Sequence, residues 1–424
     1  MRSHHFLKSR GPAAVACAVL CCSTAIAATV PPLPRVAVIK EPGKPGQFRV
    51  RDTGAPFYPQ GFNHTVLEHG DSGWHATFNV GVYDPQAMDA TLAAMTEAGA
   101  NTVRIWAWGV QQAGGFTDAE SGVNPAYMDH FIDFLRRAAR HRLYVIPILD
   151  ETPQSPYYHA IARAADERAG IPPVPGRNGQ YLNRGLIAAK RACAMDFVGY
   201  IRENAPEWCA TIPAWSLANE VCVTFTNEPF NRTAGIVTLC TGKQYDMNDR
   251  EQRQACYDES ILYWANELAS GIKEADPHAL VTTGMWTADA HGRPPRNGLW
   301  PDDKDPRIPP RPSVLAGPDS RLDFIDVHIY PWDGTSKVLP EAHEWDAVLA
   351  GRIPAIVGEY GVFKNKSIDE ARVMIREMLE QAYAMGYIGD LHWIWDLTGV
   401  PGQTWSAVEE NLASYLMRFP RPIR

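Results

Sequence analysis

The strongest constraint on the fold of this chain is a short apolar run that ends near an acidic residue and occurs in similar form twice. The first copy is Ile212–Glu220, with the sequence IPAWSLANE, and the second is Ile353–Tyr360, with the sequence IPAIVGEY. Apolar runs of this length, bounded by turn residues, are typical of strands buried on both faces of a parallel sheet. Polar groups at the C-terminal ends of such strands are typical of the catalytic rim of an α/β barrel.

The two acidic residues, Glu220 and Glu359, therefore are expected to face one another across a barrel mouth. Such a pair fits glycoside hydrolysis, in which one acid protonates the leaving oxygen and a second carboxylate attacks the sugar or activates water.

The remainder of the chain alternates between strand and helix patterns. Apolar runs before, between and after the two acidic strands predict six more strands, at residues 57–62, 101–106, 143–149, 279–286, 322–330 and 389–396. Eight strands separated mostly by helical segments predict parallel pairing and a closed (β/α)8 TIM barrel, an α/β fold, as a single domain with long βα loops.

Capping residues mark several helix starts. We expect helices after Asp84-Pro85 and Asn124-Pro125, and a capping box at Ser367–Glu370 that opens a helix ending near Gly386. Residues 152–183 and 287–321 are rich in Pro, Gly or polar residues and are expected to be rim loops, and residues 47–57 are expected to form a hairpin.

The N-terminus is typical of a secretory signal peptide. Basic Arg2, Lys8 and Arg10 precede an apolar run over residues 13–20 and the small residues 25–27. That apolar run is too short to span a membrane comfortably, so we expect a secreted or periplasmic mature protein without a membrane segment. The expected organisation is a signal peptide at 1–27, a Pro-rich leader at 28–46 and a catalytic (β/α)8 domain at 47–424.

Composition excludes some partners and leaves others. The formal net charge is -8, which disfavours nucleic acid and anionic membranes because both need a basic patch. A neutral carbohydrate partner fits this charge, and we expect a monomer. Cleavage after residue 27 leaves five cysteines, whose pairing the sequence does not determine; Cys240 with Cys256 is one candidate disulfide. We expect no cofactor, and no Cys or His spacing suggests a zinc site.

Five short motifs in barrel order resemble the glycoside hydrolases of clan A, most closely family five. They are Val103-Arg104, Asn219-Glu220, His328-Ile329-Tyr330, Gly358-Glu359 and Trp395. By this resemblance Glu220 is the acid/base and Glu359 the nucleophile of a retaining mechanism.

The resemblance also implies roles for the flanking residues. Arg104 and Tyr330 are expected to bond the Glu359 carboxylate, with Arg104 keeping its pKa low. Asn219 is expected to bind the sugar 2-hydroxyl, and His328 to hydrogen-bond the acid/base or line the pocket. Trp395 is expected to form the floor of the site that binds the reacting sugar.

Alternatives remain at both the residue and the function level. Glu228, in the sequence Asn227-Glu228-Pro229, is a rival for the acid, although the strand that bears Glu220 is already complete. The sequences RIWAW at residues 104–108 and HIYP at residues 328–331 resemble β-mannanases. A β-1,4-glucanase of cellulase type and a catalytically silent sugar-binding barrel are the alternatives. An acyl hydrolase is disfavoured because no Gly-x-Ser-x-Gly motif is present.

Overall fold

The computed structural model describes most of the chain beyond its N-terminal segment. The described residues are 30–41, 44–65, 75–108, 114–118, 120, 122–286, 306–330, 353–361 and 367–395. The chain divides into two compact units, Met1–Val30 and Pro31–Arg424, and the second contains every element below. The predicted signal peptide at 1–27 lies outside the described residues.

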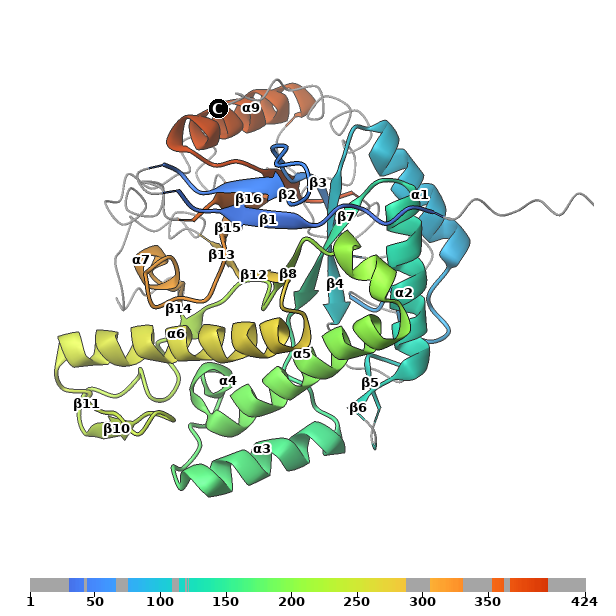
Figure 1. Ribbon diagram of the computed structural model, residues 1–424. Coiled ribbons are helices and arrows are strands. Elements are labelled where there is room, and N and C mark those ends of the chain that lie inside the picture. Colours follow the sequence, from blue (N-terminus) through green and yellow to red (C-terminus); the bar gives the residue numbers. More distant parts are fainter. Residues whose placement is uncertain are drawn as a thin grey trace, which may run out of the picture. The chain divides into compact units, whose positions relative to one another are not determined.

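The second unit is built around one parallel sheet (Figure 1). Its strands follow one another along the chain, and each pairs in parallel with its neighbour. They are β3 (Gln60–His64), β4 (Thr102–Trp108), β7 (Tyr144–Leu149), β8 (Ala214–Ser216), β12 (Leu280–Thr282), β13 (Gly284–Trp286), β15 (Ile325–Ile329), β16 (Ala355–Tyr360) and β17 (Asp390–His392). All eight predicted strand positions are therefore occupied by strands.

The sheet closes at the fifth predicted strand, which is divided into two pieces and pairs on both edges. β12 pairs with β8 on one side, whereas β13 pairs with β15 on the other, and only Thr283 separates the two pieces. The amide of Gly284 donates to the carbonyl of Ala218, and the amide of Val221 donates to the carbonyl of Gly284. The strand order thus begins and ends on one strand, which confirms the predicted (β/α)8 barrel.

The helices surround the sheet, and three of them begin where the capping residues predict. They are α1 (Pro85–Glu97), α2 (Pro125–Arg140), α5 (Arg184–Asn204), α6 (Arg250–Ala275) and α9 (Ile368–Met385). Asp84 and Asn124 cap α1 and α2, and the capping box at Ser367 and Glu370 opens α9. In Figure 1, α3 (Pro156–Ala169), α5 and α6 lie side by side on one flank of the barrel.

One predicted rim loop is wrong over part of its length. Residues 152–183 contain α3 (Pro156–Ala169) and α4 (Gly179–Leu182). α3 buries Tyr158, Ala162 and Ala165 and packs against α5, and it ends at Gly170 in the left-handed conformation. Burial of this face stabilises a helix that the surrounding Pro and Gly residues obscure in the sequence.

Part of the leader at 28–46 is a strand. β1 (Val36–Ile39) pairs antiparallel with β2 (Gln47–Val50), and residues 55–57 return alongside β2 as the hairpin prediction requires. The second predicted rim loop lies outside the described residues from 287 to 305, and its remainder contains β14 (Arg307–Ile308) and α7 (Pro312–Leu315).

Short pieces complete the described fold. They are β5 (Thr117–Asp118), β6 (Gly122–Val123), the 3-10 helix η1 (Pro206–Thr211), β9 (Val223–Thr224), β10 (Ile236–Thr238) and β11 (Gln244–Asp246). Cys240 and Cys256 are buried free thiols, as are the other three cysteines of the described chain. No helix in the described ranges is long and apolar enough to cross a membrane.

The close approach at Gly284 gives a stability prediction. A Cβ atom there lies 1.8 Å from the carbonyl oxygen of Asn219, so Gly284→Ala forces the backbone apart where the barrel closes. We expect a thermal unfolding midpoint several degrees lower, because a displaced strand loses packing and hydrogen bonds. Gly199→Ala in α5 is the control, since a Cβ atom at Gly199 meets no atom within 4 Å. It is expected to raise the free energy of unfolding by about 0.5–1 kcal/mol. A wild-type midpoint for Gly284→Ala contradicts the prediction.

Candidate active site

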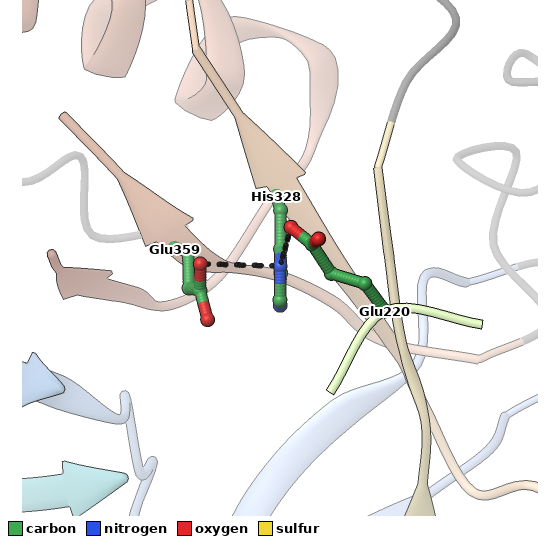
Figure 2. A group of neighbouring side chains, drawn as sticks. All are labelled: Glu220, His328 and Glu359. Atoms are coloured by element: carbon green, nitrogen blue, oxygen red, sulfur yellow. Dashed lines mark hydrogen bonds and ion pairs between the residues drawn. The ribbon is translucent and has the colours of Figure 1, made fainter. Parts of the chain in front are cut away.

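Glu220 and Glu359 meet at the C-terminal rim of the barrel. Glu359 lies on β16 with 3% of its side chain exposed, and Glu220 follows β8 with 30% exposed. Figure 2 shows His328 of β15 between them. One oxygen of each carboxylate and one ring nitrogen of His328 all lie within 4.8 Å of one another. The sequence pattern therefore brings together the two acids that it predicts.

Arg104 connects the buried Glu359 to neighbouring side chains through hydrogen bonds. From the middle of β4, its Nη1 donates to Glu359 Oε1 at 2.7 Å and to Asn63 Oδ1 at 2.9 Å. Its Nη2 donates to Asn219 Oδ1 at 3.0 Å. The guanidinium is fully buried, so the expected contact with Glu359 is a desolvated ion pair.

His328 and Tyr330 reach the same acids from β15 and the residue that follows it. His328 Nδ1 lies 2.9 Å from Glu220 Oε1 and 3.3 Å from Glu359 Oε2. The Tyr330 hydroxyl donates to Glu359 Oε2 at 2.9 Å. Both oxygens of Glu359 are thus occupied, one by Arg104 and the other by Tyr330 and His328.

The charges around the site shift the pKa of its buried groups. Burial raises the pKa of Glu359 above its ordinary value of 4.5, although the charges of His328 and Arg104 and the Tyr330 hydrogen bond oppose it. The expectation that Arg104 keeps this pKa low is therefore wrong for the net shift, because desolvation outweighs the ion pairs. Burial lowers the pKa of His328, but the charge of Glu359 and the bond to Glu220 outweigh burial and raise it.

The remaining predicted residues lie on the same rim. Asn219 directs its side-chain oxygen to Arg104, and its backbone N–H donates to Asp150 Oδ1 at 2.9 Å. Trp395 is partly exposed; its backbone amide donates to Asn63 O at 3.0 Å and its ring centroid lies 4.7 Å from that of Phe62. In the described part of the chain, the Trp395 side chain forms no hydrogen bond with either acid.

The rival acid is engaged elsewhere. Glu228 forms an ion pair with Arg232, four residues further along the chain. Within the described residues, its carboxylate forms no hydrogen bond or ion pair with Glu359. The geometry therefore favours Glu220 as the second acid of the pair.

Three residues that contact the site were not predicted from the sequence. Asn63 accepts from Arg104, Asp150 fixes the backbone of Asn219, and Asp326 lies beneath His328. The signal for Asp326 was its position two residues before His328, which places both side chains on one face of a strand. Asn63 and Asp150 also follow or end apolar strands, but many polar residues do so without contacting a site.

The three central groups are near enough to share a metal ion, but their donors are arranged for proton chemistry. His328 Nδ1 faces two carboxylate oxygens, and it contacts ionised Glu359 favourably only as an N–H donor, which cannot bind a metal. Arg104 adds a fixed positive charge against Glu359. The arrangement fits an acid that donates a proton and a buried carboxylate that attacks.

The chain matches known proteins over most of its length. A model of the family described as "Cellulase (glycosyl hydrolase family 5)" matches residues 50–399. A mannan endo-1,4-beta-mannosidase of Mytilus edulis is 22% identical over 361 residues, which cover 82% of this chain and 85% of the relative.

Solved structures show the same fold. An exo-beta-1,4-mannosidase from Opitutaceae bacterium strain TAV5 matches with a TM-score of 0.56 and 15% identity, over 90% of this chain and 61% of the other. The endo-1,4-beta-mannanase of Rhizomucor miehei matches with a TM-score of 0.54 and 16% identity, over 90% of this chain and 99% of the other. This chain thus spans less than two thirds of the bacterial protein but nearly all of the fungal one.

The hydrogen bond from Tyr330 gives a prediction on the titration of Glu359. Tyr330→Phe removes a donor that stabilises the ionised carboxylate, so we expect the pKa of Glu359 to rise by roughly one unit. Carbon-13 NMR of labelled glutamate carboxyl groups measures the midpoint, with Glu359→Gln to assign the signal. Tyr360→Phe is the control, because its hydroxyl donates to Asp390 at 3.1 Å. An unchanged midpoint in Tyr330→Phe would show that the hydroxyl does not stabilise the charge.

Proposed function

We propose that this chain, which belongs to glycosyl hydrolase family 5, is a secreted retaining enzyme that cleaves β-mannan. Membership of the family makes the chain an O-glycosyl hydrolase with a (β/α)8 barrel. The retaining mechanism, the mannan substrate and secretion are the parts that we propose. The roles of Glu220 and Glu359 are part of the same proposal.

The separation of the two acids is the observation that carries retention. Retaining glycosidases need carboxyl groups about 5–5.5 Å apart, whereas inverting enzymes need roughly 6.5–9.5 Å to admit a water. An oxygen of Glu220 and an oxygen of Glu359 lie within 4.8 Å of one another. This gap favours direct attack by a carboxylate.

The surroundings of each acid fit opposite roles. Glu359 is buried against Arg104 and Tyr330, which orient it and stabilise its charge for attack on the anomeric carbon. Glu220 is partly exposed and can meet both the leaving oxygen and, later, an incoming water. In the first step Glu220 gives its proton to the leaving group; in the second it takes a proton from the water that releases the sugar.

Two neighbours fit substrate contacts. The amide oxygen of Asn219 is held by Arg104, so its NH2 group remains as the donor for the sugar 2-hydroxyl. The partly exposed ring of Trp395 supplies an apolar surface for the reacting sugar, since sugar rings present C–H faces.

The similarity to mannan-cleaving proteins supports β-mannan as the substrate. A β-1,4-glucan is the second candidate, because the family model is named for cellulases. Assays on mannan, glucan and xylan test this choice: we expect the highest kcat/KM on mannan, with the first product of the same anomeric configuration as the substrate by proton NMR. Faster cleavage of glucan supports the alternative, and no cleavage of any polymer supports a silent sugar-binding barrel.

Protonation of Glu359 at low pH is expected to reduce activity. Glu359 attacks only when ionised, and its pKa is raised from 4.5, so kcat/KM falls as the pH drops through a value above 4.5. A pH–rate profile measures this acid limb. An acid limb at or below pH 4.5 would show that another group controls it.

The two acids can be separated by chemical rescue. With an activated aryl glycoside, we expect Glu220→Ala to form the glycosyl-enzyme and stall, because only base assistance is missing, and azide to restore turnover as a β-azido sugar. Glu359→Ala is expected to give the α-azido product, because azide then attacks the open anomeric face. Glu228→Ala is the control and should retain wild-type activity. Products of one configuration from both variants would refute the paired roles.

A further inference from the structure

A third carboxylate lies inside the barrel beneath the catalytic pair. Asp326 sits on β15, two residues before His328, and its side chain is fully buried. Its Oδ2 lies 3.4 Å from Arg104 Nε, and its Oδ1 lies 3.8 Å from His328 Nε2. Neither of these oxygens, nor His328 Nε2, has a hydrogen-bond partner in the described part of the chain.

Two glycines keep other side chains away from this pair. A Cβ atom at Gly358 lies 1.6 Å from Asp326 Oδ1, and one at Gly284 lies 2.9 Å from His328 Nε2. The carboxylate and the imidazole therefore face each other in a space that both neighbouring strands leave open. Their interaction takes place away from water, where charges act more strongly than at a surface.

The protonation state of His328 follows from its two neighbours. Nδ1 lies against two carboxylates, including ionised Glu359, so Nδ1 carries a proton. In a neutral ring the other nitrogen, Nε2, then points a bare lone pair toward the Asp326 carboxylate, which repels it. A second proton on Nε2 turns this repulsion into attraction.

We propose that Asp326 is a positioning residue that keeps His328 as the doubly protonated imidazolium, whose Nδ1–H bridges Glu220 and Glu359. This assignment rests on the proposed roles of the two acids. In the resting state Glu220 is neutral, and the charges of Arg104 and His328 then balance those of Glu359 and Asp326. His328 acts as a fixed donor and transfers no proton itself.

The charged and titratable groups facing His328 agree with a cationic ring. Burial and Arg104 lower its pKa, whereas Glu359, the bond to Glu220 and the charge of Asp326 raise it, and the net direction is up. Tyr330 also binds Glu359 beside the ring, and burial raises its pKa well above 10.0, so it stays neutral. The charges of Glu359 and Asp326, with the bond to Glu220, therefore outweigh both burial and Arg104.

The protonation of His328 is measurable without an activity assay. Nitrogen-15 NMR of the full-length protein distinguishes a doubly protonated ring from a neutral one, and the loss of signals in His328→Gln assigns the residue. We expect both ring nitrogens of the wild type to be protonated at neutral pH. A neutral ring in the wild type overturns the proposal, even if Asp326 variants fail to fold.

Asp326→Asn tests the cause of that state. The amide has the same shape without the charge, so the midpoint of His328 is expected to fall by at least about one pH unit. Asp390→Asn is the matched control, because Asp390 is an equally buried acid on β17 that accepts from Tyr360 and Tyr383. In the Asp390→Asn protein, the titration midpoint of His328 should equal that of the wild type.

An unchanged His328 midpoint in a folded Asp326→Asn protein overturns the proposal. Failure of the proposed function gives a different result: polysaccharides are not cleaved, while the NMR titration of His328 still responds to Asp326. The two ideas therefore fail in distinguishable ways.

Discussion

The site depends on the buried guanidinium of Arg104. Arg104 reaches the centre of the barrel from β4 and binds the nucleophile candidate Glu359, the amides of Asn63 and Asn219, and the carboxylate of Asp326. A buried guanidinium costs several kcal/mol in lost hydration unless its donors are satisfied. Glu359, Asn63 and Asn219 accept hydrogen bonds from the two terminal nitrogens, and Asp326 places a negative charge beside Nε; together they fix four chain segments relative to one another. Removal of Arg104 would leave the buried carboxylates of Glu359 and Asp326 without one of their counter-charges, so it is expected to affect stability as well as chemistry.

The fold and the central acids were accessible from the sequence because both depend on local pattern. Strands buried on two faces leave continuous apolar runs, and the barrel places the residues that end them on one rim. Glu220 and Glu359 were found in this way, whereas Arg104, His328 and Tyr330 were identified through the resemblance of their motifs to family five.

What the sequence did not reveal depends on packing. α3 was missed because tertiary burial against α5 stabilises it, despite the Pro and Gly residues nearby. The net pKa shift of Glu359 was given the wrong direction, because desolvation can be judged only once the depth of the side chain is known. Asp326 looked like one more polar residue in a strand until its distance to His328 was available.

The divided strand at Thr283 links folding to chemistry. Glu220 follows β8, which pairs with β12, whereas His328 belongs to β15, which pairs with β13. The contact between Glu220 and His328 therefore crosses the fifth predicted strand, at which the barrel closes. Until the fifth strand pairs on both of its edges, Glu220 is not held beside Glu359, so we expect an incompletely folded molecule to have no partial activity. We therefore expect the catalytic activity of this protein to be a direct measure of barrel closure.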